Sequence, residues 1–194
     1  MTTREKILAA VLANQPPATV LPDISSLRNE NSNLVERYIE VFKAIGGISY
    51  VVTDIAAVKQ LISENFDASK RIATTLTELS DSFELISDNV DPHSYSDLEL
   101  AIIRGHFSVA ENGAVWLTHE LMGQRIIPYI CQHLAVIVQA ETIVPTLHEA
   151  YEKIGAGNYG FGGFIGGPSK TADIEQALVQ GAHGPLSMTV FILK

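Results

Sequence analysis

The sequence is poor in cysteine and in positive charge. Its 194 residues include one cysteine, Cys131, and 13 lysines and arginines against 22 acidic residues, for a formal net charge of −9. A single cysteine excludes an intramolecular disulfide, and it excludes a zinc or iron–sulfur site held by cysteines of this chain alone. Nucleic acids and anionic membranes bind surfaces with excess positive charge. The charge balance therefore argues against both kinds of partner.

Long apolar runs and metal-binding patterns are also missing. Runs such as LAVIV at 134–138 are far shorter than the roughly 20 residues that span a bilayer. The histidines show no H-x-x-x-H or H-x-x-E-H spacing, and no carboxylate cluster is spaced like metal ligands. We therefore expect no metal site and no membrane insertion. The start, MTTREKILAAVLA, superficially resembles a signal peptide, but its apolar residues recur at helical spacing, which favours a cytoplasmic protein.

Apolar residues make up 46% of the chain, enough for one well-buried core at this length. Apolar runs bounded by turn residues predict strands at 48–53, 71–75, 99–105, 114–118, 134–139 and 186–193. Helical spacing predicts helices at 2–14, 34–45, 55–62, 141–153 and 172–180. Strands that alternate with helices predict an α/β fold, an open and mostly parallel twisted sheet with helices on both faces. We assign residues 1–21 to an N-terminal helical appendage and 22–194 to a single α/β domain.

The segment GAGNYG, residues 155–160, matches the G-x-G-x-x-G pattern of dinucleotide-binding loops. That fingerprint has to follow a strand and open a helix. Here the glycines follow the helix-like HEAYEKI, and they run into further glycines that do not start a helix. We interpret the segment as a loop that returns to a strand, and we expect no nucleotide cofactor.

The segment GGPSKTADIE, residues 166–175, is a stronger candidate for a binding site. Pro168 fixes a turn, and Ser169 or Thr171 can cap the helix predicted over 172–180. A helix that begins at the end of a strand offers free N–H groups and a positive dipole to an anion.

Four other residues of this segment bear on the same prediction. Gly166 and Gly167 allow a ligand to approach the backbone, and Lys170 adds positive charge. Asp173, in the first turn of the predicted helix, disfavours a doubly charged anion. Ordinary helix capping explains the same residues equally well, so spacing alone leaves both interpretations open.

Two further turns carry candidate residues. VAENGAVWL at 109–117 places Glu111 beside an Asn-Gly turn, which favours a hairpin, although an acid at a sheet edge can also be a nucleophile or general base. AHGP at 182–185 places His183 in a loop, where a structural role is the more common one. Cys131 lies in an apolar run and is interpreted as a small buried hydrophobic residue.

These stretches together resemble the LUD-domain family, the proteins related to lactate utilisation protein C. GGPSKTADIEQALVQGAHGP is similar to the family's G-P-S-R-T-A-D-I-E…G-x-H-G-P signature, and VAENGA is similar to its A-E-T-G-T turn. The similarity extends from about residue 45 to the end of the chain. The positions that match the two motifs are Glu111, Gly113, Gly167, Pro168, Ser169, Thr171, Asp173, His183, Gly184 and Pro185.

The resemblance implies a fold like that of the sugar-isomerase and CoA-transferase superfamily. It also implies a cytoplasmic component that acts with iron–sulfur oxidoreductase subunits in oxidising L-lactate to pyruvate, without a cofactor of its own. A cleft of Glu, Ser and His would bind a small carboxylate or a partner group, with Glu111 and His183 as catalytic residues. The ligand-binding residues would be Gly113, Gly166, Gly167, Pro168, Ser169, Lys170, Thr171, Asp173, Gly184 and Pro185.

The sequence departs from the family pattern in three places, one of which is Cys131-Gln132-His133, where the family has a leucine-proline approach to the histidine. Asn112 and Ala114 replace threonines, and Lys170 replaces an arginine that would recognise a carboxylate in bidentate fashion. Two alternatives stay open. In a CoA- or acyl-transferase-like enzyme, Glu111 would be the nucleophile, as in the S-E-N-G turn of CoA transferases. In a non-catalytic scaffold subunit, the motifs would serve only the fold.

Overall fold

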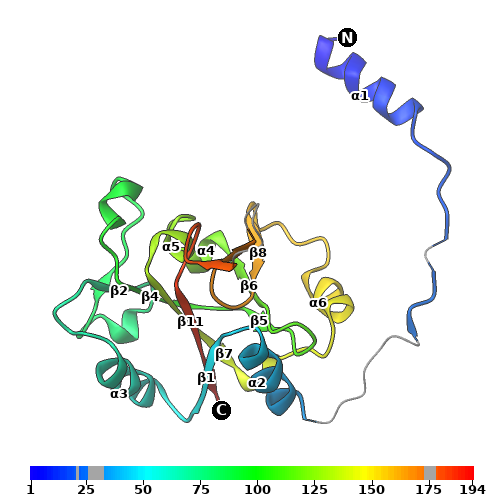
Figure 1. Ribbon diagram of the computed structural model, residues 1–194. Coiled ribbons are helices and arrows are strands. Elements are labelled where there is room, and N and C mark those ends of the chain that lie inside the picture. Colours follow the sequence, from blue (N-terminus) through cyan, green and yellow to red (C-terminus); the bar gives the residue numbers. More distant parts are fainter. Residues whose placement is uncertain (21, 26–32, 173–177) are drawn as a thin grey trace.

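The computed structural model describes residues 1–20, 22–25, 33–172 and 178–194. Its centre is a six-stranded sheet with the strand order β1-β11-β7-β4-β2-β3, in which every pair of neighbours is parallel (Figure 1). The strands are β1 (Ile48–Val52), β2 (Ile72–Thr74), β3 (Glu84–Leu85), β4 (Leu100–Arg104), β7 (His133–Gln139) and β11 (Ser187–Leu193). The predicted open α/β fold is therefore confirmed.

The central strands are apolar on both faces. In β7, Leu134 and Val136 pack in the core on one side of the sheet, whereas Ala135 and Ile137 pack in the core on the other side. Successive side chains of a strand point to opposite faces, so a continuous apolar run indicates a strand covered on both sides.

Helices cover both faces of this sheet (Figure 1). On one face lies α3 (Ile55–Asn65), with Val58 and Ile62 fully buried. Asp54 caps this helix, because its carboxylate accepts the N–H of Ala57 at 2.8 Å. Buried side chains of the other core come from α2 (Leu34–Ala44), α4 (His119–Met122) and α5 (Ile127–Ile130).

A second, three-stranded antiparallel sheet follows β4. It has the order β5-β6-β8 and consists of β5 (Phe107–Ser108), β6 (Val115–Thr118) and β8 (Gly162–Ile165). The strand predicted at 114–118 therefore exists, but it lies in this sheet and not in the parallel one. The pairing of Ser108 with Val115 confirms the hairpin that the Asn-Gly turn predicted.

Helix α6 (Leu147–Ile154) begins later than the predicted helix at 141–153. Residues 140–142 form a 3-10 turn, and Thr146 starts the helix with a capping box. The Thr146 hydroxyl accepts the N–H of Glu149, and the Glu149 carboxylate accepts the N–H of Thr146. The signature T-x-x-E that produces this start is visible in the sequence and outweighs the apolar spacing before it.

The prediction of a helix over 172–180 is wrong, because both ends of this range are strands. Strand β9 (Lys170–Ala172) pairs antiparallel with β10 (Leu178–Gln180), and Thr171 lies opposite Val179. Residues 173–177, including Asp173, lie outside the described residues. Both residues of the central pair are β-branched and favour strands, and this cross-strand pairing outweighs the helical spacing on which the prediction rested. A helix N-terminus at Ser169 or Thr171 is therefore absent from the described part of the segment.

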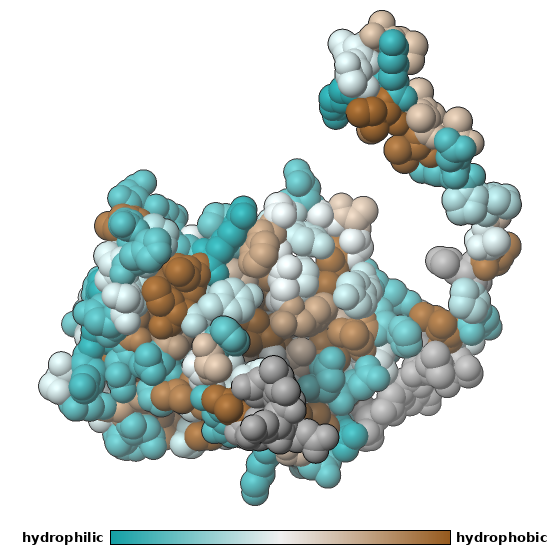
Figure 2. Space-filling view, turned by 45° about the horizontal axis from the view of Figure 1, so that its top comes forward, coloured by the Kyte–Doolittle hydropathy of each residue, from teal (hydrophilic) through white to brown (hydrophobic). Residues whose placement is uncertain are grey.

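The N-terminal helix α1 (Thr3–Ala13) lies apart from the body of the molecule, and none of its residues is buried (Figure 1). Figure 2 shows apolar side chains on its surface, which include the exposed Ile7 and Leu12. The division at residue 21 stays a prediction. Among the described residues, no helix has the length and apolar character that crossing a bilayer requires.

Candidate functional site

Two of the three turns that carry motif residues, AENGA and GGPSK, meet at the C-terminal end of α2. A Cβ atom added at Gly113 would lie 3.0 Å from Ile45 Cδ1, and one added at Gly167 would lie 3.1 Å from the Ile45 carbonyl oxygen. Both glycines have positive φ, 73° and 74°, so each position disfavours other residues through its backbone as well as through this contact. The structure therefore brings the AENGA turn and the GGPSK turn together around Ile45.

Lys170 reaches the same place from β9. Its ammonium donates a hydrogen bond to the carbonyl oxygen of Ile45, the residue that ends α2. The last carbonyls of a helix lack partners within the helix, and a cation there is favourable. Lys170 therefore binds the negative end of α2, while its other two N–H donors leave capacity for a further acceptor.

The third predicted turn, AHGP, packs on the second. Ser169 N donates to the Pro185 carbonyl oxygen at 2.8 Å, and a Cβ added at Gly184 would lie 3.2 Å from Ser169 Cβ. Gly181 N donates to the Ser169 carbonyl oxygen at 3.0 Å. These contacts hold the two halves of the C-terminal motif side by side, with the His183 side chain exposed to solvent.

Glu111 has a different partner from the one its motif suggested. Its Oε2 atom accepts the N–H of Leu147 at 2.7 Å, at the first residue of α6. A carboxylate there satisfies a free N–H and interacts favourably with the helix dipole. Within the described part of the chain, Glu111 makes no hydrogen bond to Ser169 or His183. The predicted cleft of Glu, Ser and His, and the catalytic roles in it, therefore stay predictions.

We expect Glu111→Ala to lower the free energy of unfolding by about 1–2 kcal/mol, because it leaves the Leu147 N–H without its acceptor. Glu111→Gln retains an acceptor oxygen and should lose less. Urea denaturation followed by circular dichroism measures both values. Glu141→Ala, which removes another exposed carboxylate, is the control and should change the value by less than about 0.5 kcal/mol. Equal values for Glu111→Ala and the control would contradict the capping role.

Tyr38 contacts the AENGA turn and was not among the predicted site residues. It is fully buried in α2, and its hydroxyl donates to the Gly113 carbonyl oxygen at 3.2 Å. Burial raises the pKa of the Tyr38 phenol, so the hydroxyl stays protonated as a donor. The sequence placed this residue only within the helix predicted at 34–45. A tyrosine at a core position was the available signal, because a buried hydroxyl needs a partner.

The structure confirms the interpretation of Cys131 as a buried hydrophobic residue. Its side chain lies in the core, and burial raises the pKa of the thiol to about 12. The thiolate, which is the nucleophilic form, is therefore scarce at neutral pH. Among the residues that the structure describes, no group of three or more His, Cys, Asp and Glu side chains could hold a metal ion.

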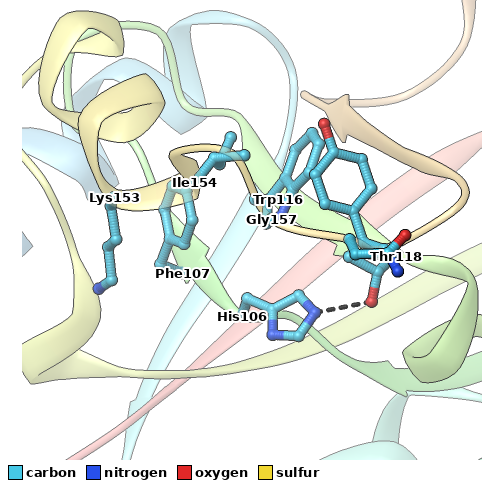
Figure 3. Close-up of a pocket in the computed structure, with 9 residues that line it drawn as sticks. His106, Phe107, Trp116, Thr118, Lys153, Ile154 and Gly157 are labelled. Atoms are coloured by element: carbon cyan, nitrogen blue, oxygen red, sulfur yellow. Dashed lines mark hydrogen bonds between the residues drawn. The ribbon is translucent and has the colours of Figure 1, made fainter.

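The GAGNYG segment is the loop that its context predicted. Gly155 ends α6 with a φ of 55°, and the chain continues through the loop into β8. The glycine pattern thus follows a helix and precedes a strand, the reverse of a dinucleotide-binding loop. The loop has another property that the sequence did not reveal: Gly157, Asn158 and Tyr159 line a pocket of about 410 Å³ (Figure 3).

Comparison with a solved structure supports the fold. A DUF162 family protein from Deinococcus radiodurans superposes with a TM-score of 0.62, covering 83% of this chain and 96% of that one, at 15% sequence identity. At this level of identity the likeness concerns the fold alone.

Comparison with curated proteins finds relatives that are similar to about half of this chain. Lactate utilization protein C from Oceanobacillus iheyensis is 30% identical over 101 residues, which cover 49% of this chain and 43% of that protein. Lactate utilization protein C 1 from Bacillus mycoides is 33% identical over 101 residues, with the same coverages. Lactate utilization protein C from Geobacillus kaustophilus is 31% identical over 112 residues, which cover 54% and 45%. The chain thus spans about half the length of the curated relatives it matches.

The LUD domain profile matches residues 93–193, more than half of the chain. This range contains all three motif turns, the α6 helix that Glu111 caps, and the central strands β4, β7 and β11. By this match, the chain belongs to the LUD domain family.

Proposed function

We propose that this chain is a component of a cytoplasmic system that oxidises L-lactate to pyruvate together with iron–sulfur partner proteins. The relatives named lactate utilization protein C support this role, because they are similar to this chain across about half of their length. With Cys131 buried as its single cysteine, the chain has no cysteine set for a cluster of its own. The electrons of lactate oxidation would therefore pass to partner proteins.

The observation that carries this proposal is the packing of the motif turns on one another. The AENGA, GGPSK and AHGP turns, which are more than 50 residues apart at their extremes, are joined by contacts through Ile45 and Ser169. The exposed surface of these three turns, the motif surface, includes the Lys170 ammonium and the His183 ring. A small carboxylate or an acidic group of a partner would bind there, with Lys170 as a point charge.

A CoA- or acyl-transferase activity is less well supported. It would require Glu111 as a free nucleophile, whereas Glu111 Oε2 accepts a backbone hydrogen bond from α6. The likeness of the fold to that of CoA transferases stays a prediction.

The proposal predicts the phenotype of a deletion. Removing the gene from its source organism should abolish growth on L-lactate as the carbon source and leave growth on glucose unchanged. The wild-type gene should restore growth, whereas Lys170→Met should restore it incompletely, because the exposed motif surface loses its cation. Lys70→Met, which removes another exposed ammonium, is the matched control and should restore growth fully. Normal growth of the deletion strain on L-lactate would contradict the proposal.

A further inference from the structure

The pocket beside the GAGNYG loop is not part of the motif surface. It lies between the β5–β6 hairpin, the C-terminal turn of α6 and residues 157–159. His106, which lines the pocket, follows the carboxyl end of β4, and Lys153 donates to the carbonyl oxygen of Thr142, which follows β7. Open α/β sheets bind ligands beyond the carboxyl ends of their strands. A volume of about 410 Å³ is typical of a site for a small organic molecule.

One wall of the pocket is aromatic. Trp116 and Phe107 line it, and they are 7% and 3% exposed, so their rings are held firmly by the protein. Tyr159, from the GAGNYG loop, lies edge-on to Trp116 with the ring centroids 5.3 Å apart. Aromatic surfaces arranged in this way accept the face or edge of another planar ring.

The polar groups lie at two ends of this wall, as Figure 3 shows. At one end, His106 Nε2 and Thr118 Oγ1 are hydrogen-bonded at 2.7 Å. Desolvation lowers the pKa of His106, and the opposing effect of Glu120 is smaller, so this ring is neutral at neutral pH. Its other ring nitrogen has no hydrogen-bond partner among the described residues.

Lys153 occupies the other end. Its ammonium lies 5.0 Å from the centre of the Phe107 ring, and its bond to Thr142 is long, at 3.4 Å. An ammonium group has three N–H donors, so two of them remain for a ligand within the described structure. Among the described residues that line the pocket, Lys153 is the one permanently charged side chain, because His106 is neutral.

We propose that this pocket binds a small planar carboxylate, with its ring against Trp116 and its carboxylate at Lys153. The single cation matches a single negative charge, and the aromatic wall matches a ring. The neutral His106 and the Asn158 amide supply hydrogen bonds to polar substituents of the ring. This site is separate from the motif surface, so the proposal does not depend on a role in lactate oxidation.

The single tryptophan of the chain makes the proposal directly testable. Trp116 lines the pocket, so its fluorescence is expected to change when this site is occupied. Titration of the full chain with benzoate should change this fluorescence with saturation. Benzamide keeps the ring without the charge, and L-lactate keeps the carboxylate without the ring. Each should bind at least roughly tenfold more weakly than benzoate, as measured in parallel by titration calorimetry.

Two variants assign the binding to Lys153. Lys153→Met keeps the length of an exposed side chain and removes the charge, and it should weaken benzoate binding by roughly tenfold. Lys6→Met removes a charge on α1, no residue of which lines the pocket, and should leave binding unchanged. Urea unfolding of both variants confirms that they are folded. The proposal is overturned by the absence of saturable binding, by L-lactate binding as tightly as benzoate, or by full binding to Lys153→Met.

Discussion

Replacing Phe42 by alanine is expected to lower the free energy of unfolding by about 3–5 kcal/mol. Phe42 is 0% exposed, and its ring stacks on that of Tyr38 with the centroids 5.4 Å apart. A Cβ atom added at Gly47 would lie 2.2 Å from the Phe42 ring, which shows how closely the backbone packs on it. The loss would be measured by urea denaturation followed by circular dichroism.

Two comparisons test whether this loss comes from core packing. Phe42→Leu retains most of the apolar volume and should be less destabilising than Phe42→Ala. Leu12→Ala, on the exposed face of α1, should change the free energy by less than about 0.5 kcal/mol. Equal losses of unfolding free energy for Phe42→Ala and Leu12→Ala would contradict the packing of α2 on the parallel sheet.

The same variant bears on the motif surface, because α2 supports two of its three turns, AENGA and GGPSK. A Cβ atom at Gly113 would lie 3.3 Å from the Phe42 Cα atom, and the Tyr38 hydroxyl holds the Gly113 carbonyl. Loss of the Phe42 ring leaves a cavity beside Tyr38, so we expect the AENGA turn to become less rigid. Hydrogen exchange at the Gly113 amide, which donates to Val109 O at 2.9 Å, should be faster in Phe42→Ala.

For helix α2, the sequence predicted the local structure but not the tertiary contacts. The apolar face of this helix is a local property, and the spacing of the side chains predicted a helix at 34–45. Its contacts with Gly113 and Gly167 join parts of the chain that are far apart in sequence. Periodicity identifies the face of a helix that is buried, but not the partner that buries it. The meeting of the motif turns at Ile45 was therefore beyond prediction from spacing.

The errors in the C-terminal motif have a related cause. A turn with Pro168 followed by Ser169, Thr171 and an acid is the usual signature of a helix start. The same residues are compatible with a strand if a partner strand is available, and β10 supplies one at Val179. Local propensity was weaker than this pairing. At Glu111 the local pattern also left the partner open, and the acceptor that Leu147 needed lies 36 residues away in sequence.

Arg71→Met is expected to lower the free energy of unfolding by about 1–3 kcal/mol at neutral pH, because it removes several charged hydrogen bonds together. Arg71 binds Glu84 in bidentate fashion, with Nε–Oε2 and Nη2–Oε1 distances of 2.8 and 2.7 Å. Its Nη1 atom donates to Asp97 Oδ1 at 2.6 Å and to the Ser94 carbonyl oxygen at 2.5 Å. The guanidinium also lies 4.9 Å from the centre of the Tyr95 ring. The side chain therefore holds the segment from β3 to residue 97 against β2.

The loss should depend on pH in a defined direction. The hydrogen bonds from Arg71 hold the pKa values of Glu84 and Asp97 below their ordinary values. A carboxyl group whose pKa is lower in the folded state stabilises the fold above its unfolded pKa, and this contribution disappears as the pH falls through the folded value. The unfolded values are about 4, so the contribution is complete above about pH 5 and declines below about pH 4.

The difference in unfolding free energy between wild type and Arg71→Met should therefore be largest near neutral pH and shrink in acid. Taking the difference removes the contributions of the other titrating groups, which are common to both proteins. Urea denaturation at about pH 7, 5 and 3.5 measures the trend across the window in which the carboxyl groups titrate. Arg4→Met, on the exposed α1, should match wild type at each pH. A difference that stayed constant from neutral pH into acid would mean that Arg71 stabilises the fold by packing on Tyr95 and by its bond to Ser94, and not by its charge.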